Sequence, residues 1–244
     1  MAAAPNMRLK LTGAVVLRKP LCRALGGIGD RPAPLRRRVS RPQLKRDPLG
    51  GGMGRIIVSE NITLDGVVQD PAGVEGFRHG GWVGRVGERG REGAAKVLLD
   101  EALGAEAQLF GRRTYEFLAA RWPSRVGEFA DRFNDMPKYV VSSTLEDPSW
   151  NNTTVLKGHA ANEVSKLKRH VGGEIVVAGS IQLVRALFDH DLVDELRLMI
   201  YPIVLGDGER LFRATSDKRA MRLIATRTVD NDLAYLTYQT VRDA

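Results

Sequence analysis

Short apolar runs alternate along most of this chain with longer segments whose apolar residues recur at helical spacing. The short runs, rich in Val, Ile, Leu and Phe, have the length of buried parallel strands. The segments between them place apolar residues three or four positions apart, as one face of a helix does. The pattern predicts strands at residues 55–59, 107–110, 138–142 and 174–178, and helices at residues 90–103, 113–120, 160–170 and 181–189.

The pattern changes toward the C-terminus. Residues 196–204 form a long apolar run, and residues 221–229 and 233–241 alternate around Asp230-Asn231-Asp232. Alternation about a short polar turn predicts an antiparallel hairpin. The earlier strand–helix order predicts a largely parallel sheet with helices on both faces. We therefore expect an α/β fold in which the hairpin closes a mixed sheet.

Charge divides the chain into two parts. Residues 1–50 hold 12 Lys and Arg against two acids, Asp30 and Asp47, which gives a net charge of +10. The other residues hold 25 bases and 27 acids, a net charge of −2. The positive charge thus belongs to a leader, and the rest has no general basic face for nucleic acid. We expect a disordered leader at residues 1–52 and one domain at residues 53–244.

The leader admits several explanations. Its apolar stretch at residues 14–17 is short for a secretory signal, whereas its Arg-rich, acid-poor composition fits a transit peptide except for scarce Ser and frequent Pro and Gly. An Arg-rich arm that binds RNA or DNA is a further alternative. We favour Met53 as the natural start, because the Gly-ended leader stops there and a clear strand begins.

The residues that are missing from the domain exclude some chemistry. Cys22 is the only cysteine and lies in the leader, so the domain has no disulfide, no thiolate nucleophile and no cysteine-ligated zinc. We predict no metal site. Since no apolar run approaches the roughly 20 residues that cross a bilayer, we expect a cytoplasmic protein that does not bind membranes.

Three predicted junctions carry residues that suit a phosphate. Gly111 permits close backbone approach, and residues 112–114 supply helix amides, two cations and a hydroxyl. A serine pair at residues 142–143 follows the next strand, and residues 179–180 begin another helix. Each motif alone has a plainer explanation as a helix cap, a turn or a solvated charge. Because parallel strands end at one sheet edge, the three together favour a nucleotide site.

Five ordered motifs carry a resemblance to a known family. They are TLDG at residues 63–66, GRRTYE at 111–116, VVSSTL at 140–145, AGSIQL at 178–183 and a closing segment at 193–212. On these motifs, residues 53–241 resemble the dihydrofolate-reductase-like fold, specifically the family related to the C-terminal reductase domain of the riboflavin-biosynthesis deaminase-reductase RibD. The resemblance implies a three-layer α/β fold.

The resemblance also implies NADPH as the cofactor. The arginines and Thr114 would bind its pyrophosphate and 2′-phosphate, the serine pair would lie on the adenosine side, and the backbone of Asn61 and Val68 would hold the nicotinamide carboxamide. The complete implied set is Asn61, Val68, Gly111, Arg112, Arg113, Thr114, Ser142, Ser143, Gly179, Ser180 and Ile181. Classical dihydrofolate reductases have two glycines where this chain has Gly179-Ser180. Their pterin-binding carboxylate has no compelling counterpart here, although Glu92 lies near the corresponding helix start.

The family implies an NADPH-dependent reductase that transfers hydride to a C=N bond of a pteridine-like or aminopyrimidine-ribose substrate, as in riboflavin biosynthesis. A nucleotide- or flavin-binding protein of the same fold without turnover is the alternative. Asp65 is a candidate proton donor, although Asp-Gly is also a common turn pair. His79, in a Gly-rich loop, is a second candidate with a surface position as its plainer explanation. Trp82 is either a wall of the substrate pocket or a packed aromatic.

Relatives in this fold often pair, and we expect a homodimer. The apolar run at residues 196–204 and the C-terminal hairpin offer a surface for a partner copy. Pro202 within that run suggests an edge or a bulge, because a proline in a strand is tolerated mainly there, and an open apolar edge favours association. The alternative is a monomer in which the hairpin covers the edge.

Overall fold

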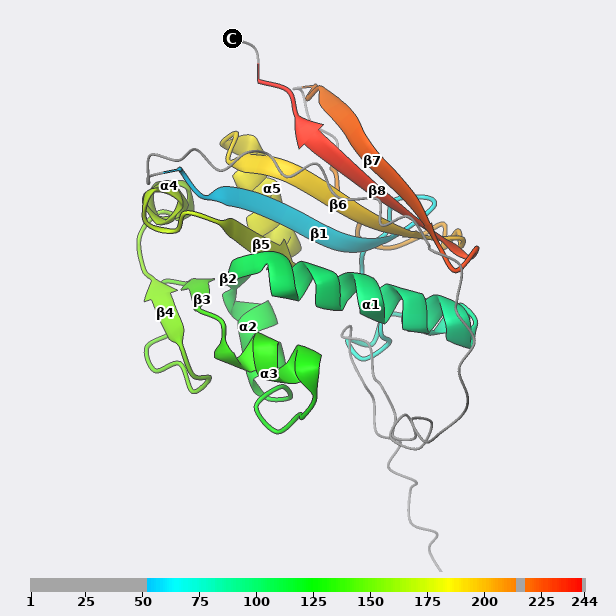
Figure 1. Ribbon diagram of the computed structural model, residues 1–244, viewed down its shortest axis with the longest axis horizontal. Helices are drawn as coiled ribbons and strands as arrows, with labels where there is room; N and C mark the ends of the chain where they lie inside the picture. The colour runs from blue at the N-terminus through cyan, green and yellow to red at the C-terminus, as the bar shows by residue number, and fades with distance from the viewer. Residues whose placement is uncertain (1–51, 214–217, 243–244) are drawn as a thin grey trace, which may run out of the picture.

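The structure, a computed structural model, describes residues 52–213 and 218–242. The predicted leader, apart from Gly52, lies outside the described residues. An eight-stranded sheet in the order β4-β3-β2-β5-β1-β6-β8-β7 forms the centre of the domain (Figure 1). The strands are β1 (Arg55–Thr63), β2 (Ala105–Gly111), β3 (Lys138–Val141), β4 (Thr153–Leu156), β5 (Glu174–Ala178), β6 (Val193–Tyr201), β7 (Met221–Val229) and β8 (Leu233–Thr240).

The sheet is mixed, as the sequence predicts. The six strands from β4 to β6 run parallel, whereas β8 pairs antiparallel with both β6 and β7. Asp230 and Asn231 lie in the turn between β7 and β8 with positive φ angles of 48° and 63°, a backbone conformation that Asp and Asn tolerate better than most residues. The expected α/β class with a C-terminal antiparallel hairpin is therefore confirmed.

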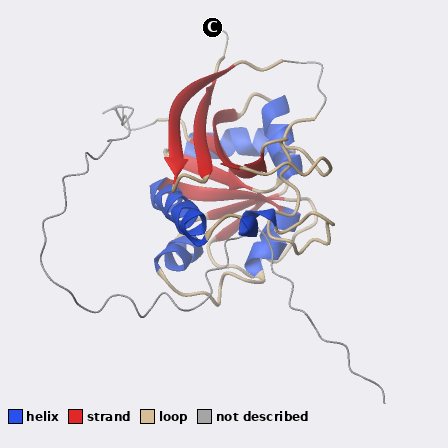
Figure 2. Ribbon diagram, turned by 90° about the vertical axis from the view of Figure 1, so that its right-hand side faces the viewer, coloured by secondary structure: helices blue, strands red, loops and turns tan. Residues whose placement is uncertain are grey.

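Helices cover both faces of the sheet (Figure 2). The helices are α1 (Glu88–Gly104), α2 (Arg112–Ala119), α3 (Glu128–Asp135), α4 (Ala160–His170) and α5 (Ile181–Asp189), with a short 3-10 helix, η2, at Trp82–Arg85. One apolar core joins α4 and α5 to side chains such as Val58, Leu109 and Val177. The opposite core joins α1, α2 and α3 to Ile57, Phe110 and Val176. The expected three layers are confirmed. No helix in the described ranges is long and apolar enough to span a bilayer.

Two elements escaped the sequence pattern, and one argument from it was wrong. Helix α3 buries only Ala130 and Phe133, and β4 is a four-residue strand without a fully buried residue, so both give a weak periodic signal. Strand β6 ends at Tyr201, and it pairs with β1 on one side and β8 on the other. Pro202 therefore lies beyond an interior strand and marks no sheet edge. The hairpin covers β6, and the edge strand on that side is β7.

Candidate functional site

A cavity of about 880 Å³ opens at the carboxyl ends of β1, β2 and β5. Strand β1 lines it with residues 59–61, the β2–α2 junction with residues 110–114, and the β5–α5 junction with residues 178–183. Its size is that of a typical ligand pocket, and its place is the sheet edge at which open α/β folds bind ligands. The cavity lies where the junction motifs predict a site.

Hydrogen bonds tie the two junctions together. The backbone N–H of Gly111 donates to Ser180 Oγ at 2.9 Å, and the backbone N–H of Ser180 donates to Thr114 Oγ1 at 3.1 Å. Gly179 and Ser180 both adopt positive φ, at 66° and 58°. Glycine adopts this backbone freely, and a Cβ on Gly179 would also approach Thr114 Cγ2 to 3.4 Å. The AGSI turn is thus held in one conformation by the helix start opposite.

The two helix starts suit an anion. Helices α2 and α5 begin at this cavity, and neither has an N-cap side chain bonded to its first amides. Free N-terminal amides and the helix dipole attract phosphate or carboxylate groups. Arg112 and Arg113 add two exposed cations on the same wall, and Arg112 also pairs with Glu116 at 2.9 Å. These residues fit a pyrophosphate-containing cofactor.

Most of the predicted cofactor residues meet at the cavity. Those that line it are Asn61, Val68, Gly111, Arg112, Arg113, Thr114, Gly179, Ser180 and Ile181. Ser142 and Ser143 are not among the lining residues. The hydroxyl of Ser142 accepts hydrogen bonds from the backbone N–H groups of Thr144 and Leu145, at 3.2 and 3.0 Å. Ser142 therefore organises the turn after β3, and the adenosine role of the serine pair stays a prediction.

The candidate proton donor Asp65 lies outside the cavity lining. Its carboxylate accepts hydrogen bonds from Thr63 Oγ1 at 2.7 Å and from the backbone N–H groups of Gly206 and Leu205 at 2.8 and 3.2 Å. Desolvation acts to raise the pKa of Asp65, but these hydrogen bonds outweigh it and lower the pKa. Asp65 thus joins two loops as a carboxylate, and no contact supports its predicted catalytic role.

Trp82 packs outside the main cavity. Its indole N–H donates to the backbone carbonyl of Gln69 at 2.9 Å, and its ring meets Tyr201 edge to face at 5.2 Å. It lines a separate cavity of about 260 Å³. His79 makes a similar edge contact with Phe77. Within the described residues, no group of three or more His, Cys, Asp or Glu could hold a metal ion.

Sequence reasoning missed an acid inside the cavity. Glu60 lies on the face of β1 that Ile56, Val58 and Ile62 bury, and only 8% of it is exposed. Glu60 lines the cavity, and its Oε1 has no hydrogen-bond partner. Burial raises the pKa of Glu60 to about 8, against a lowering effect of a backbone hydrogen bond from Gly179. Glu60 therefore keeps a proton at neutral pH. The available signal was an acid at an inward position of an apolar strand.

A second acid, Glu101 of α1, reaches the cavity from the other face of the sheet. It accepts hydrogen bonds from Ser59 Oγ at 2.8 Å and from the Tyr235 hydroxyl, and Arg197 NH1 lies 3.8 Å from it. All but 2% of Arg197 is buried. Elements far apart in the chain thus meet at Glu101.

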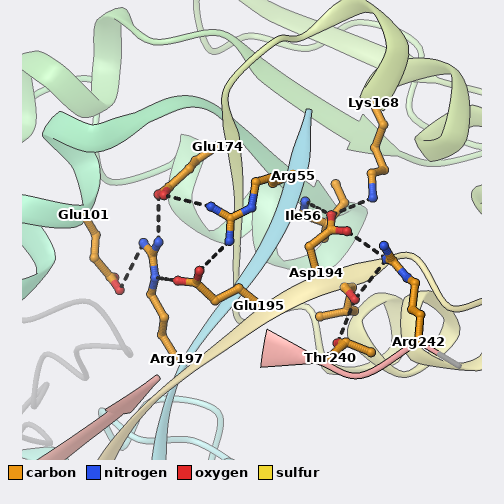
Figure 3. A network of polar contacts seen from close by, with 11 residues as sticks. Arg55, Ile56, Glu101, Lys168, Glu174, Asp194, Glu195, Arg197, Thr240 and Arg242 are labelled. Carbon is orange, nitrogen blue, oxygen red and sulfur yellow. Dashed lines mark hydrogen bonds and ion pairs between the residues drawn. The ribbon is translucent and has the colours of Figure 1, made fainter. Parts of the chain in front are cut away.

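Arg197 connects Glu101 to a buried ion network (Figure 3). Its guanidinium contacts Glu195 at 2.6 Å and Glu174 at 2.9 Å, and Arg55 contacts Glu195 at 2.6 Å. Burial acts to lower the pKa of Arg197, but the surrounding carboxylates outweigh it and raise the pKa. The network joins β1, β5, β6 and α1 below the cavity and fixes the position of its floor.

Comparison with known proteins supports the same fold and site. The RibD C-terminal domain matches residues 55–235 of this chain. The uncharacterized protein YyaP of Bacillus subtilis (strain 168) is 25% identical over 196 residues, which cover 75% of this chain and 94% of YyaP. Two solved structures share the fold. A protein of Shewanella sp. PV-4 described under riboflavin biosynthesis has a TM-score of 0.60 and 20% identity, covering 77% of this chain and 99% of its own. A pyrimidine reductase-like protein of Corynebacterium diphtheriae has a TM-score of 0.51 and 16% identity, covering 78% and 92%.

Proposed function

This chain belongs to the RibD C-terminal domain family, a family of reductases, and from that premise we propose an NADPH-dependent reductase. Its substrate would carry a C=N bond in a pteridine-like or aminopyrimidine-ribose framework, as in riboflavin biosynthesis. The related fold of the pyrimidine reductase-like protein supports this substrate class.

The observation that carries the proposal is the pair of uncapped helix starts at one cavity. The amides at the starts of α2 and α5 would hold the cofactor pyrophosphate, with the Ser180–Gly111 contact fixing the distance between them. Arg112 and Arg113 would bind the 2′-phosphate, since Ser142 and Ser143 lie outside the cavity lining. The preference for NADPH over NADH would then rest on the two arginines.

The chain's own residues would orient the reactants and supply a proton. When bound, the cofactor supplies the hydride, and residues of the cavity wall hold the acceptor carbon in position and exclude water. Adding hydride to the carbon of a C=N bond leaves a negative nitrogen that takes up one proton. Glu60, protonated at neutral pH and lining the cavity, would donate that proton and regain it from water. This role replaces the one expected of Asp65.

The test has two stages with the full chain. Calorimetric titration should give a lower Kd for NADPH than for NADH, and equal values would contradict the assignment of the 2′-phosphate site. The loss of reduced-nicotinamide absorbance is then followed with dihydrofolate and with riboflavin-pathway aminopyrimidines. Oxidation of NADPH with one of these supports the reductase. Tight NADPH binding without oxidation in any mixture would instead favour the non-catalytic nucleotide-binding alternative.

A further inference from the structure

The main cavity continues inward from the sheet edge, between the sheet and helices α1 to α3. Its inner wall is aromatic, and we call this part the aromatic recess. The recess is formed by Phe110, Phe117, Trp122, Phe129 and Phe133, together with Gln108 of β2. The Trp122 ring meets Phe129 at 5.2 Å and Phe133 at 5.0 Å between centroids. Phe117 and Phe129 are only half-buried, so aromatic surface remains available to a ligand.

Two buried polar atoms in the recess have no hydrogen-bond partner. They are the side-chain carbonyl oxygen of Gln108 and the indole N–H of Trp122, on residues that are 4% and 6% exposed. Buried polar atoms are nearly always hydrogen-bonded, because an unpaired one loses its contact with water without compensation. An acceptor and a donor left unpaired in the wall of one cavity point to a ligand that pairs with both.

The other tryptophans show that Trp122 is an exception. All three tryptophans of the chain lie in the described residues. The indole N–H of Trp150 donates to Asn134 Oδ1 at 2.8 Å, and that of Trp82 donates to the backbone carbonyl of Gln69 at 2.9 Å. The fold therefore satisfies the indole that lies in each packed region and leaves unsatisfied the one that lines the cavity.

We propose that the aromatic recess binds a flat, uncharged heterocycle with a lactam edge, a ring N–H next to a ring carbonyl. Trp122 donates its indole N–H to the ring carbonyl, and Gln108 accepts the ring N–H. Aromatic side chains pack against the ring, an arrangement favourable for flat ligands. Charged groups of the ligand stay at the outer end, near Arg112 and Arg113. The proposal rests on the proposed function only in taking this ring as that of the substrate.

Binding of two probes tests the donor and the acceptor separately. Lumazine is a flat bicyclic ring with lactam N–H groups and carbonyls, and 1,3-dimethyllumazine keeps the carbonyls but lacks those N–H groups. The full chain is titrated with each probe by calorimetry, without cofactor. We expect Trp122→Phe to raise the Kd of both probes about tenfold, the factor for one hydrogen bond. Gln108→Leu should raise the Kd of lumazine about tenfold and leave that of 1,3-dimethyllumazine unchanged.

Trp82→Phe is the matched control, because it removes an indole N–H that is already paired outside the cavity. It should leave the affinity for both probes unchanged. Melting temperatures give a second readout. Gln108→Leu should keep or raise the melting temperature of the free protein, because it removes an unpaired buried carbonyl. A structural role for Gln108 predicts a lower melting temperature instead and would overturn the proposal.

The remaining outcomes separate the recess from the reductase. Failure of lumazine to bind, or equal affinity in wild type, Gln108→Leu and Trp122→Phe, overturns the recess proposal even where NADPH oxidation is measured with another substrate. Lumazine binding that depends on Gln108 and Trp122 supports the recess, and it does so even where no NADPH oxidation is found and the proposed function alone fails.

Discussion

Ser180 Oγ accepts a 2.9 Å hydrogen bond from the backbone N–H of Gly111, 69 positions earlier in the chain. The contact joins the start of α5 to the start of α2, the two helix ends that face the cavity. It also gives a physical reason for a serine at a position where classical dihydrofolate reductases have glycine. The hydroxyl fastens the turn that a second glycine would leave free.

Replacing Ser180 by alanine should therefore weaken both stability and cofactor binding. The variant leaves the Gly111 N–H without its acceptor and keeps the left-handed backbone of residue 180. We expect a loss of about 1 kcal/mol in the free energy of unfolding, measured with urea. Ser180→Gly loses the same bond but adopts positive φ without strain, so it should be more stable than Ser180→Ala. The reverse order would contradict a role for the hydroxyl contact.

Arg113→Ala should weaken NADPH binding by about 1–3 kcal/mol, the range for hydrogen bonds to charged groups. NADH, which lacks the 2′-phosphate, should bind this variant as it binds the wild type. Arg222→Ala provides the control, because Arg222 is an exposed arginine of the edge strand β7 and does not line the cavity. Calorimetric titration measures all three proteins. An NADPH affinity unchanged by Arg113→Ala would leave that arginine as a solvated charge.

Glu60 makes stability depend on pH in a defined direction. Its pKa rises from 4.5 to about 8 on folding, so the folded state holds a proton that the unfolded state has lost between these values. The contribution of Glu60 to stability is fully present below pH 4.5 and is lost as pH rises toward 8. We expect Glu60→Gln to gain on wild type by up to a few kcal/mol in the free energy of unfolding between pH 5 and 7.5.

Urea titrations at pH 5, 6 and 7.5 measure this difference. They stop below pH 8, because burial also lowers the pKa of Lys138 to about 8 and adds a second titration above it. Glu60→Gln should also abolish NADPH oxidation while it retains NADPH binding, since the amide cannot donate a proton to nitrogen. Identical pH profiles for Glu60→Gln and wild type would show that Glu60 is ionised in the folded protein.

Arg197→Met should destabilise the domain by about 3–5 kcal/mol, the cost of leaving buried carboxylates without their partner. Glu101, Glu174 and Glu195 would lose the cation they share. The loss should shrink as pH falls toward 4, because protonated carboxyl groups no longer repel each other. Chemical denaturation at pH 7 and pH 4 provides the test. A loss that is equal at both pH values would mean that packing, rather than charge, sets the effect.

The homodimer stays a prediction, and the structure changes the surface on which it should form. Leu198 is 9% exposed in the core beneath α5, so it cannot contact a partner. Strand β7 is the sheet edge and exposes Leu223 and Ile224 by 49% and 44%. We expect light scattering of the full chain to give the mass of two copies, and Leu223→Lys with Ile224→Lys to give one copy without lowering the melting temperature. A single-copy mass for the wild type would contradict the dimer.

The sequence by itself determined the order of the elements and the place of the phosphate-binding motifs. Helical and strand periodicity act within windows of a few residues, and turn residues such as Gly179 act within one peptide, so both can be recognised locally. The rule that parallel strands end at one sheet edge then brought residues 111–114 and 178–181 together before any contact was known. Elements with little buried apolar surface, such as α3 and β4, stayed outside the reach of this reasoning.

Only the tertiary structure decided which polar side chains became unusual. Glu60, Gln108 and Trp122 are unpaired because segments distant in sequence close around them without offering a partner. Glu101 and Tyr235 meet across 134 positions, and no local pattern encodes that contact. Burial and pairing are properties of the assembled neighbourhood, since the pKa and the hydrogen bonds of a group depend on what surrounds it. The junction motifs of this protein are therefore written in local sequence, whereas its acid, its ion network and its aromatic recess arise from the packing of the sheet.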